Sequence, residues 1–267
     1  MELATIKITN LKKQLLISAL CVFGSTCVYA ASDEWHFNII PYFWAVNVEG
    51  DIEVGVPAEG ISNQLLHISE DYKSIMKHVH SGGILDVNVS KGRFGIFLNA
   101  MYVDLRNLEI TTSDGFEVQE NTKYEIYGAG AFYKIIDYKL GPFSNFAWGP
   151  YAGARYTNNL SSATLIEAPE YGSSYNAHWT EPFVGTTLTF DITKHWTINV
   201  AADVGIIAKQ QDSYNLIGMI GFKPLDYLTI YAGYRQFYQS FIKGSGASFF
   251  EWKMHMRGPI VGFAFGV

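Results

Sequence analysis

The feature that most constrains this chain is a two-residue alternation of apolar and polar side chains, which recurs in segments of about ten residues. The stretch 197–205 shows it most clearly, because every second residue from Ile198 to Val204 is apolar, whereas Asn199 and Asp203 lie on the other face. Beyond residue 30, no segment approaches the run of about 18 apolar residues that a membrane-spanning helix requires. The pattern therefore predicts an all-β protein.

The alternating segments predict about ten strands, with eight or twelve left open, at 35–48, 77–90, 94–107, 122–135, 145–158, 178–192, 196–208, 213–223, 227–241 and 249–267. Tight turns at 91–93, 193–195 and 224–226 occur at alternate junctions, and most other connections are longer, with 136–144 irregular. Short turns on one side and long loops on the other are typical of outer-membrane barrels. Because unpaired backbone groups are costly in lipid, we predict a closed, antiparallel, up-and-down transmembrane β-barrel.

The first 30 residues have the order of a secretory signal peptide. Three lysines precede an apolar run at 15–22, and small residues follow up to Ala30. Cleavage after Ala30, or after the neighbouring Ala31, gives two parts: a signal peptide at 1–30 and a barrel at 31–267. Cys27 leaves lipoprotein processing as an alternative, although the three residues before it lack the expected aliphatic side chain.

The composition excludes several classes of partner and site. Removing the predicted signal leaves 16 basic and 24 acidic residues, a net charge near −8, without a basic stripe for nucleic acid. Both cysteines, Cys21 and Cys27, lie in the signal, so we expect no disulfide and no thiolate metal site. The 15% aromatic and 16% charged content is typical of a sheet whose outer face contacts membrane lipid, and we expect that lipid as a partner.

Two further patterns bear on the barrel. The apolar set of the last strand changes phase after Met256, and a bulge at Gly258-Pro259 would restore the lipid-facing side. Aromatic residues gather near the strand ends, where membrane girdles lie. They are Trp148, Trp196, Phe222 and Tyr227 at the low ends and Tyr156, Trp179, Tyr214, Phe250 and Trp252 at the high ends.

Several short motifs resemble a family of small, mostly uncharacterised, porin-like or OmpA-OmpW-like outer-membrane barrels. They are Trp35-His36-Phe37 with Pro41-Tyr42-Phe43-Trp44, the stretch 149–156, Ala232-Gly233-Tyr234-Arg235, and Arg257-Gly258-Pro259 with Gly262-Phe263. The resemblance spans the chain beyond the signal and implies residence in a bacterial outer membrane. It also implies the barrel-assembly machinery as a partner during biogenesis, with Phe263 and Phe265 near the C-terminus as recognition residues. It implies no substrate.

Charged residues on the predicted inner face are the first candidates for function. They are Asp86, Glu125, Arg155, Glu181, Asp203, Arg235, Glu251, Lys253 and Arg257, together with Asp191. A barrel of this size is little wider than one that side chains can fill, so these charges could pair and plug the interior. Alternatively, they could line a narrow polar pore that selects ions or small solutes.

Other candidate sites are weaker. His178 near Glu181 and His255 near Glu251 are the only pairs suited to a hydrolase or acyltransferase at the outer rim, and no Gly-x-Ser-x-Gly elbow is present. His78 and His80, two apart on a predicted strand, are weak metal candidates together with the preceding His67. A small apolar ligand could bind inward-facing aromatic side chains, namely Tyr127, Tyr133, Tyr151 and Tyr231.

The long connection at 49–76 is the most distinctive segment outside the predicted strands. Its apolar residues have spacings that a short helix could use, and Ser69 with Glu70 and Asp71 is a helix start. Such a helix could cap or narrow the barrel mouth, or rest on the rim.

Taken together, the sequence predicts a non-enzymatic outer-membrane barrel without a cofactor or catalytic residue. It is either a narrow porin-like channel or a structural and surface-interaction barrel. A barrel enzyme acting on lipid or peptide and a binder of a small apolar ligand remain as alternatives.

Overall fold

The computed structural model describes residues 34–54, 64–111, 115, 117–168, 172–206 and 211–266. The predicted signal peptide and its cleavage position at Ala30 lie outside these residues. The strands are β1 (Trp35–Trp44), β2 (Asn47–Val54), β3 (Gln64–Glu70), β4 (Val79–Lys91), β5 (Phe94–Thr111), β6 (Glu117–Tyr133), β7 (Ile136–Lys139), β8 (Asn145–Leu165), β9 (Gly172–Asp191), β10 (Trp196–Gly205), β11 (Gln211–Leu225), β12 (Leu228–Lys243) and β13 (Phe250–Gly266). The helices are α2 (Tyr72–His78) and the one-turn η1 (Gly246–Ser248).

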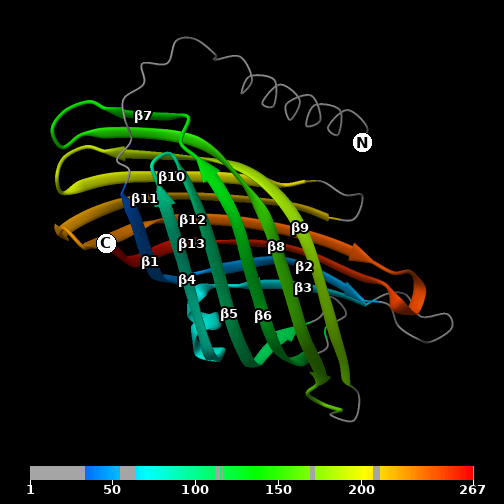
Figure 1. The fold of residues 1–267 in the computed structure, drawn as a ribbon. Coiled ribbons are helices and arrows are strands. Elements are labelled where there is room, and N and C mark those ends of the chain that lie inside the picture. Colours follow the sequence, from blue (N-terminus) through cyan, green and yellow to red (C-terminus); the bar gives the residue numbers. More distant parts are fainter. Residues whose placement is uncertain are drawn as a thin grey trace, which may run out of the picture. The chain divides into compact units, whose positions relative to one another are not determined.

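Ten antiparallel strands form a closed barrel, as the alternation predicted, and β2, β3 and β7 are additional (Figure 1). Neighbouring strands follow one another along the chain, and β1 closes the ring by pairing with both β4 and β13. We call the end that holds the start of β1 and the end of β13 the lower end. The three predicted tight turns lie at this end, and β7 forms a short hairpin with β8 that accounts for the irregular segment 136–144.

The first predicted strand continues upward in two pieces. β1 follows β13 up to the pair Trp44 and Ile260, and β2 resumes along the same strand at Asn47 opposite Arg257. Between them the Ala45 N–H donates to the Pro259 carbonyl at 2.9 Å. β2 then pairs with β3, so much of the predicted loop 49–76 is a strand hairpin.

The polarity of the barrel wall inverts along its height. In the lower half, apolar side chains such as Ile220 and Val261 point outward and are about half exposed (54% and 46%). In the upper half of β13, Trp252, Met254 and Met256 point inward and are buried, and the residues between them point outward. The outer face of the lower half is therefore suited to contact lipid, and the outer face of the upper half is suited to contact water.

The prediction of a bulge at Gly258-Pro259 is wrong, because β13 pairs regularly with β12 through these residues. The β12–β13 register runs without a shift from Leu228 opposite Phe265 to Lys243 opposite Phe250. The apolar set changes phase because the surroundings of the outer face change from lipid to water, and the strand itself stays regular.

Exposed aromatic residues mark both edges of the apolar outer belt. At the lower edge Trp196 contacts Phe222 at 5.0 Å between ring centroids, and at the upper edge Tyr214 stacks on Tyr238 at 5.6 Å. The predicted upper girdle is wrong for three residues. Trp179, Phe250 and Trp252 are buried inside the upper barrel. None of the described helices is long and apolar enough to cross a membrane.

Candidate functional site

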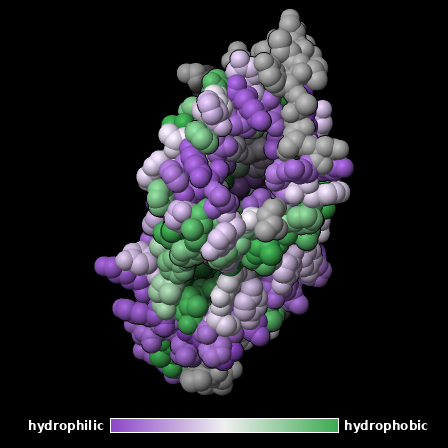
Figure 2. Space-filling view, turned by 60° about the vertical axis from the view of Figure 1, so that its left-hand side comes forward, coloured by the Kyte–Doolittle hydropathy of each residue, from purple (hydrophilic) through white to green (hydrophobic). Residues whose placement is uncertain are grey.

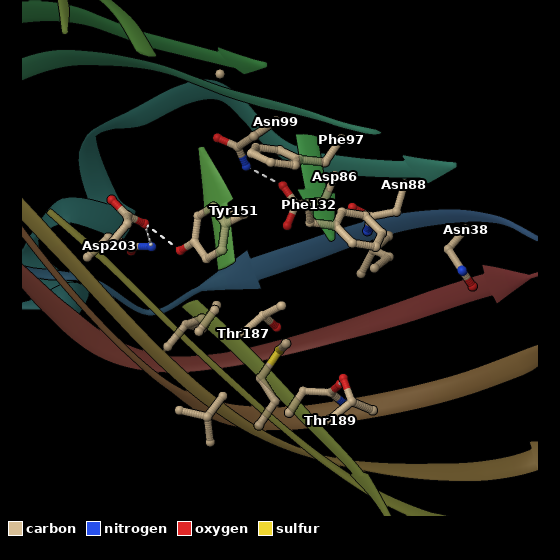
Figure 3. Close-up of a pocket in the computed structure, with 18 of the residues that line it drawn as sticks. Asn38, Asp86, Asn88, Phe97, Asn99, Phe132, Tyr151, Thr187, Thr189 and Asp203 are labelled. Atoms are coloured by element: carbon tan, nitrogen blue, oxygen red, sulfur yellow. Dashed lines mark hydrogen bonds between the residues drawn. The ribbon is translucent and has the colours of Figure 1, made fainter. Parts of the chain in front are cut away.

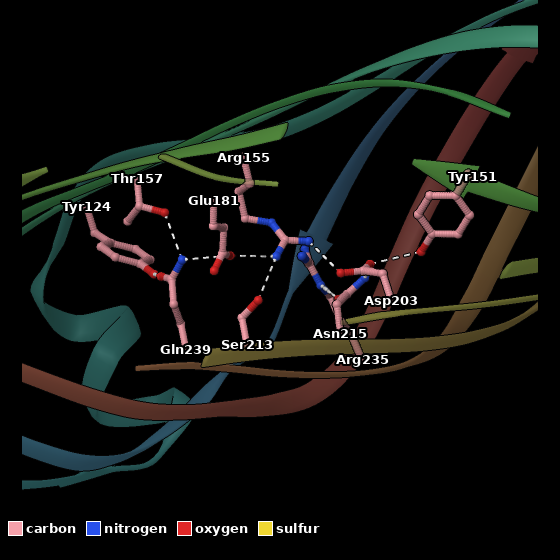
Figure 4. Close-up of polar contacts among 10 residues, drawn as sticks. All are labelled: Tyr124, Tyr151, Arg155, Thr157, Glu181, Asp203, Ser213, Asn215, Arg235 and Gln239. Atoms are coloured by element: carbon pink, nitrogen blue, oxygen red, sulfur yellow. Dashed lines mark hydrogen bonds and ion pairs between the residues drawn. The ribbon is translucent and has the colours of Figure 1, made fainter. Parts of the chain in front are cut away.

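A network of buried polar side chains crosses the lumen at mid-height, at the level where the wall changes polarity (Figure 4). Its centre is Arg155 on β8, whose Nη1 lies 2.9 Å from Oε1 of Glu181 on β9. Nη2 of Arg155 lies 2.8 Å from Oδ1 of Asp203 on β10, and Nη1 also donates to the Ser213 hydroxyl at 3.3 Å. Arg155, Glu181 and Asp203 are all less than 10% exposed. One guanidinium therefore neutralises much of the charge of two buried carboxylates.

A second arginine extends the network toward β1. Asn215 donates to Asp203 and accepts from Nε of Arg235, both at 2.9 Å, and Nη1 of Arg235 donates to the Tyr42 hydroxyl at 2.7 Å. The Arg235 guanidinium carbon lies 4.7 Å from the ring centroid of Trp44. Hydrogen bonds to neutral groups and an aromatic face thus hold this cation within the barrel.

On its upper side the network ends at β6. Gln239 donates to Oε1 of Glu181 at 3.3 Å and to the Thr157 hydroxyl at 2.9 Å, and it accepts from the Tyr124 hydroxyl at 2.7 Å. The Phe237 ring, 1% exposed, packs 4.9 Å from the guanidinium carbon of Arg155. Hydrogen bonds therefore connect β1 to β6 across the lumen, and a buried aromatic ring fills space between the two arginines.

Below the network lies a cavity of about 410 Å³ that is lined by both polar and apolar side chains. Figure 3 shows asparagine, threonine and aspartate side chains along its walls, with Asn99 hydrogen-bonded to Asp86 and Tyr151 donating to Asp203. Arg155 and Arg235 belong to both the network and the cavity lining. The network thus forms the inner boundary of this cavity.

The structure brings five of the nine predicted lumen charges to the inner face: Asp86, Arg155, Glu181, Asp203 and Arg235. Four of them take part in or line the mid-height network, and Asp86 lies in the cavity below. Asp191, also expected inside, pairs with Lys223 at 3.1 Å near the lower end.

The prediction is wrong for the other four charged residues. Glu125, Glu251, Lys253 and Arg257 lie on the outer face of their strands. Glu251 pairs with Lys253 at 2.5 Å, and this pair raises the lysine pKa. Arg257 pairs with Glu49 at 2.8 Å, and Asn158 donates to Glu125 at 3.2 Å. The error follows from the inverted polarity, because the apolar face of these upper segments is the inner one.

Sequence reasoning missed the uncharged members of the network, which are Tyr42, Tyr124, Thr157, Ser213, Asn215 and Gln239. A signal for Gln239 existed, because it lies four residues after Arg235 on β12 and therefore on the same face. Uncharged side chains were not considered as members, although a buried carboxylate needs such hydrogen-bond donors.

The predicted histidine sites are not assembled. His78 ends α2, so it is not on a strand with His80, and its Nδ1 lies 3.2 Å from the Arg106 carbonyl oxygen. His67 pairs with Asp51 at 2.8 Å. Among the described residues, no group of three or more His, Cys, Asp or Glu side chains is arranged to hold a metal ion.

The pairs considered for rim catalysis are separated or exposed. His178 is exposed and lies near Tyr156, whereas Glu181 is buried in the lumen. His255 is on the outer face, 4.4 Å from the Tyr238 ring centroid. Of the four tyrosines expected to face inward, Tyr151 and Tyr231 line the lower cavity; Tyr127 and Tyr133 are exposed outside.

The helix predicted in the segment 49–76 is present as α2, although it starts two residues later than expected. Asp71 caps it by accepting the Ser74 N–H at 2.8 Å. α2 packs against β5 and β2, and Ile75 is buried. It therefore forms part of the barrel wall and does not cap or narrow the mouth.

No protein-family model and no curated protein matches this sequence. Among solved structures, the outer membrane protease OmpT from Escherichia coli aligns with 91% of this chain and 100% of its own, at 10% identity and a TM-score of 0.56. The attachment invasion locus protein Ail of Yersinia pestis aligns with 88% of this chain and 99% of its own, at 9% identity and a TM-score of 0.35.

The chain has the fold of the outer-membrane β-barrels. Identity of 10% with OmpT supports the fold alone, so the roles of this barrel must be argued from its own residues.

Proposed function

We propose that this barrel is a non-enzymatic outer-membrane protein that does not conduct, and that it acts through its envelope position and its outer surface. The observation that carries the proposal is the hydrogen-bonded layer from Tyr42 to Tyr124, with Arg155 at its centre. A pore for ions needs a continuous water-filled path. At the level of this layer, Phe237, Gln239 and Glu181 are at most 1% exposed.

Residence in the outer membrane is supported by the outer surface. The belt of exposed apolar side chains between two aromatic edges matches the hydrocarbon layer and its interfaces. Closure of the sheet satisfies backbone groups that lipid cannot. The charged outer face of the upper half then projects from the membrane, where it can contact other molecules.

A narrow channel is the second candidate, and the polar side chains of the lower cavity favour it. Its asparagine and threonine lining could hydrate a small solute, provided that the arginine layer opens. The two candidates differ in what a folded barrel does in a bilayer.

The test is single-channel conductance of the protein purified from membranes and inserted into a planar bilayer. Folding is checked first by comparing the gel mobility of boiled and unboiled samples, which differs for an intact barrel. We expect no discrete steps from the wild type, and none from Arg235→Ala despite its lower stability. Reproducible steps from folded wild type overturn the proposal; steps from Arg235→Ala alone support the narrow channel.

A further inference from the structure

A second cavity, of about 360 Å³, lies in the upper barrel beside α2, on the other side of the arginine layer. Its lining is apolar or aromatic apart from two carboxylates, one threonine and two glycines. Figure 2 shows a hollow bordered by hydrophobic side chains on one face of the molecule. Apolar cavities of this size are typical of small-molecule sites.

Methionine is concentrated around this cavity. Four of the chain's six methionines line it, namely Met76, Met101, Met254 and Met256. Methionine side chains are unbranched and adapt their shape to apolar partners. This lining can therefore fit molecules of similar polarity and different outline.

The few polar groups in the lining define what can bind. In the described part of the chain, the buried indole N–H groups of Trp44 and Trp252 have no hydrogen-bond acceptor. Glu120 accepts from the Thr122 hydroxyl at 2.6 Å, and burial raises the pKa of the Glu120 carboxyl. No lysine or arginine lines the cavity, and Glu70 is its other carboxylate. An anionic head group would therefore be repelled, and an uncharged hydrogen-bond acceptor would be matched.

The strand pairing of the barrel wall is interrupted beside this cavity, where α2 packs against β5 and β2. Among the described residues, β3 pairs only with β2, and none pairs with the edge of β5 above the β4–β5 ladder. The described sheet is therefore interrupted between β3 and β5. The cavity is lined from both sides of this gap, by Ile68 of β3 and Leu108 of β5. Its lining also includes Phe43, which is 50% exposed on the outer face.

We propose that this upper cavity binds a largely hydrocarbon, uncharged molecule with one hydroxyl or carbonyl group, which reaches it through the gap between β3 and β5. The hydrocarbon part contacts the methionines, and the polar group accepts from the indole N–H of Trp44 or Trp252. The molecule can come from the membrane or from the medium, since both hold compounds of this chemistry. The site shares Tyr42, Trp44 and Tyr124 with the arginine layer, but binding there does not depend on whether the barrel conducts.

The test uses the protein in amphipol and three ten-carbon probes: radiolabelled decan-1-ol, decane and decanoate. We expect saturable binding of decanol, weaker binding of decane and the weakest binding of decanoate. Val103→Phe, which adds a ring to the cavity wall, should abolish saturation. Val200→Phe, the same change on the outer face of the lower barrel, should leave it intact. Val48→Phe replaces the first variant if that one fails to fold by gel mobility.

The polar contact is tested separately. Trp252→Phe keeps an aromatic ring and removes the unpartnered N–H together with part of the indole, so decane binding controls for the lost volume and gel mobility for the fold. Losing one hydrogen bond should weaken decanol binding about fivefold and leave decane binding unchanged. An unchanged ratio in both Trp252→Phe and Trp44→Phe overturns the assigned contact.

Mass spectrometry of a solvent extract of the purified protein distinguishes the sources. A stoichiometric neutral lipid supports loading from the membrane, and an empty extract with saturable decanol binding supports uptake from the medium. An empty extract together with decanol binding that Val103→Phe does not change overturns the site.

Discussion

Arg155 and Glu181 face each other directly across β8 and β9, and their 2.9 Å ion pair is closed off from solvent. Oε2 of Glu181 has no hydrogen-bond partner among the described residues, so the arginine is the main compensation for this carboxylate. The pair lies at the level where the lipid-facing belt ends.

Arg155→Met is expected to lower the free energy of unfolding by about 3–5 kcal/mol, because it leaves Glu181 and Asp203 buried without their cation. Urea unfolding of the reconstituted barrel measures the change. The matched control is Arg257→Met, whose pair with Glu49 is about half exposed and should contribute about 0–1 kcal/mol. Equal losses in the two variants would contradict the importance of the buried pair.

The lipid belt gives a second prediction. Val200→Arg places a cation in the middle of the lower outer face. It should lower the free energy of unfolding, measured in lipid vesicles, by about 2–4 kcal/mol. Asn176→Arg, on the exposed outer face of the upper half of β9, should change stability little. If Val200→Arg is tolerated as well as Asn176→Arg, then the lower half does not lie in hydrocarbon.

Glu120 should make stability depend on pH. Burial raises its pKa in the folded state above the ordinary value of 4.5, so the folded barrel holds the proton more tightly than the unfolded chain. Stability is therefore lost as pH rises from about 4.5 toward the raised value. Glu120→Gln should remove this loss, and the stability gap between variant and wild type should widen over that range in urea unfolding. Glu109→Gln, at an exposed position, controls for the removal of a charge.

The helix beside the upper cavity depends on one cap. Asp71→Ala removes the acceptor of the Ser74 N–H and should destabilise α2 by about 0.5–2 kcal/mol. Amide hydrogen exchange should rise at 72–78 and stay unchanged in β8, whereas Asp71→Asn should keep the protection. Unchanged exchange in the alanine variant would show that packing of Ile75, and not the cap, holds the helix.

The sequence predicted the ten-strand antiparallel barrel because alternation and turn spacing are local and repeat along the chain. It could not decide which face of a strand is inside, since an apolar side chain suits both lipid and a packed interior. That ambiguity placed Glu251, Lys253 and Arg257 in the lumen, whereas Arg155 and Arg235, at mid-height, do lie on the inner face.

The second cavity could not be predicted, because its lining comes from segments distant in sequence, such as β2, β5 and β13. The hairpin of β2 and β3, by contrast, could have been predicted from the alternation in its sequence. Val48, Ile52 and Val54 alternate with Glu49, Asp51 and Glu53, and this alternation is that of a strand that continues above the membrane.

On β13, only three residues separate the outward Arg257 from the outward Val261. A thicker bilayer would have to cover the guanidinium, and a thinner one would leave Val261 and Phe263 in water. The barrel should therefore sit at a fixed depth and prefer membranes of matching hydrocarbon thickness, with a cost for each ångström of mismatch. The position of the membrane surface is thus fixed by the sequence of β13 itself, between Arg257 and Val261.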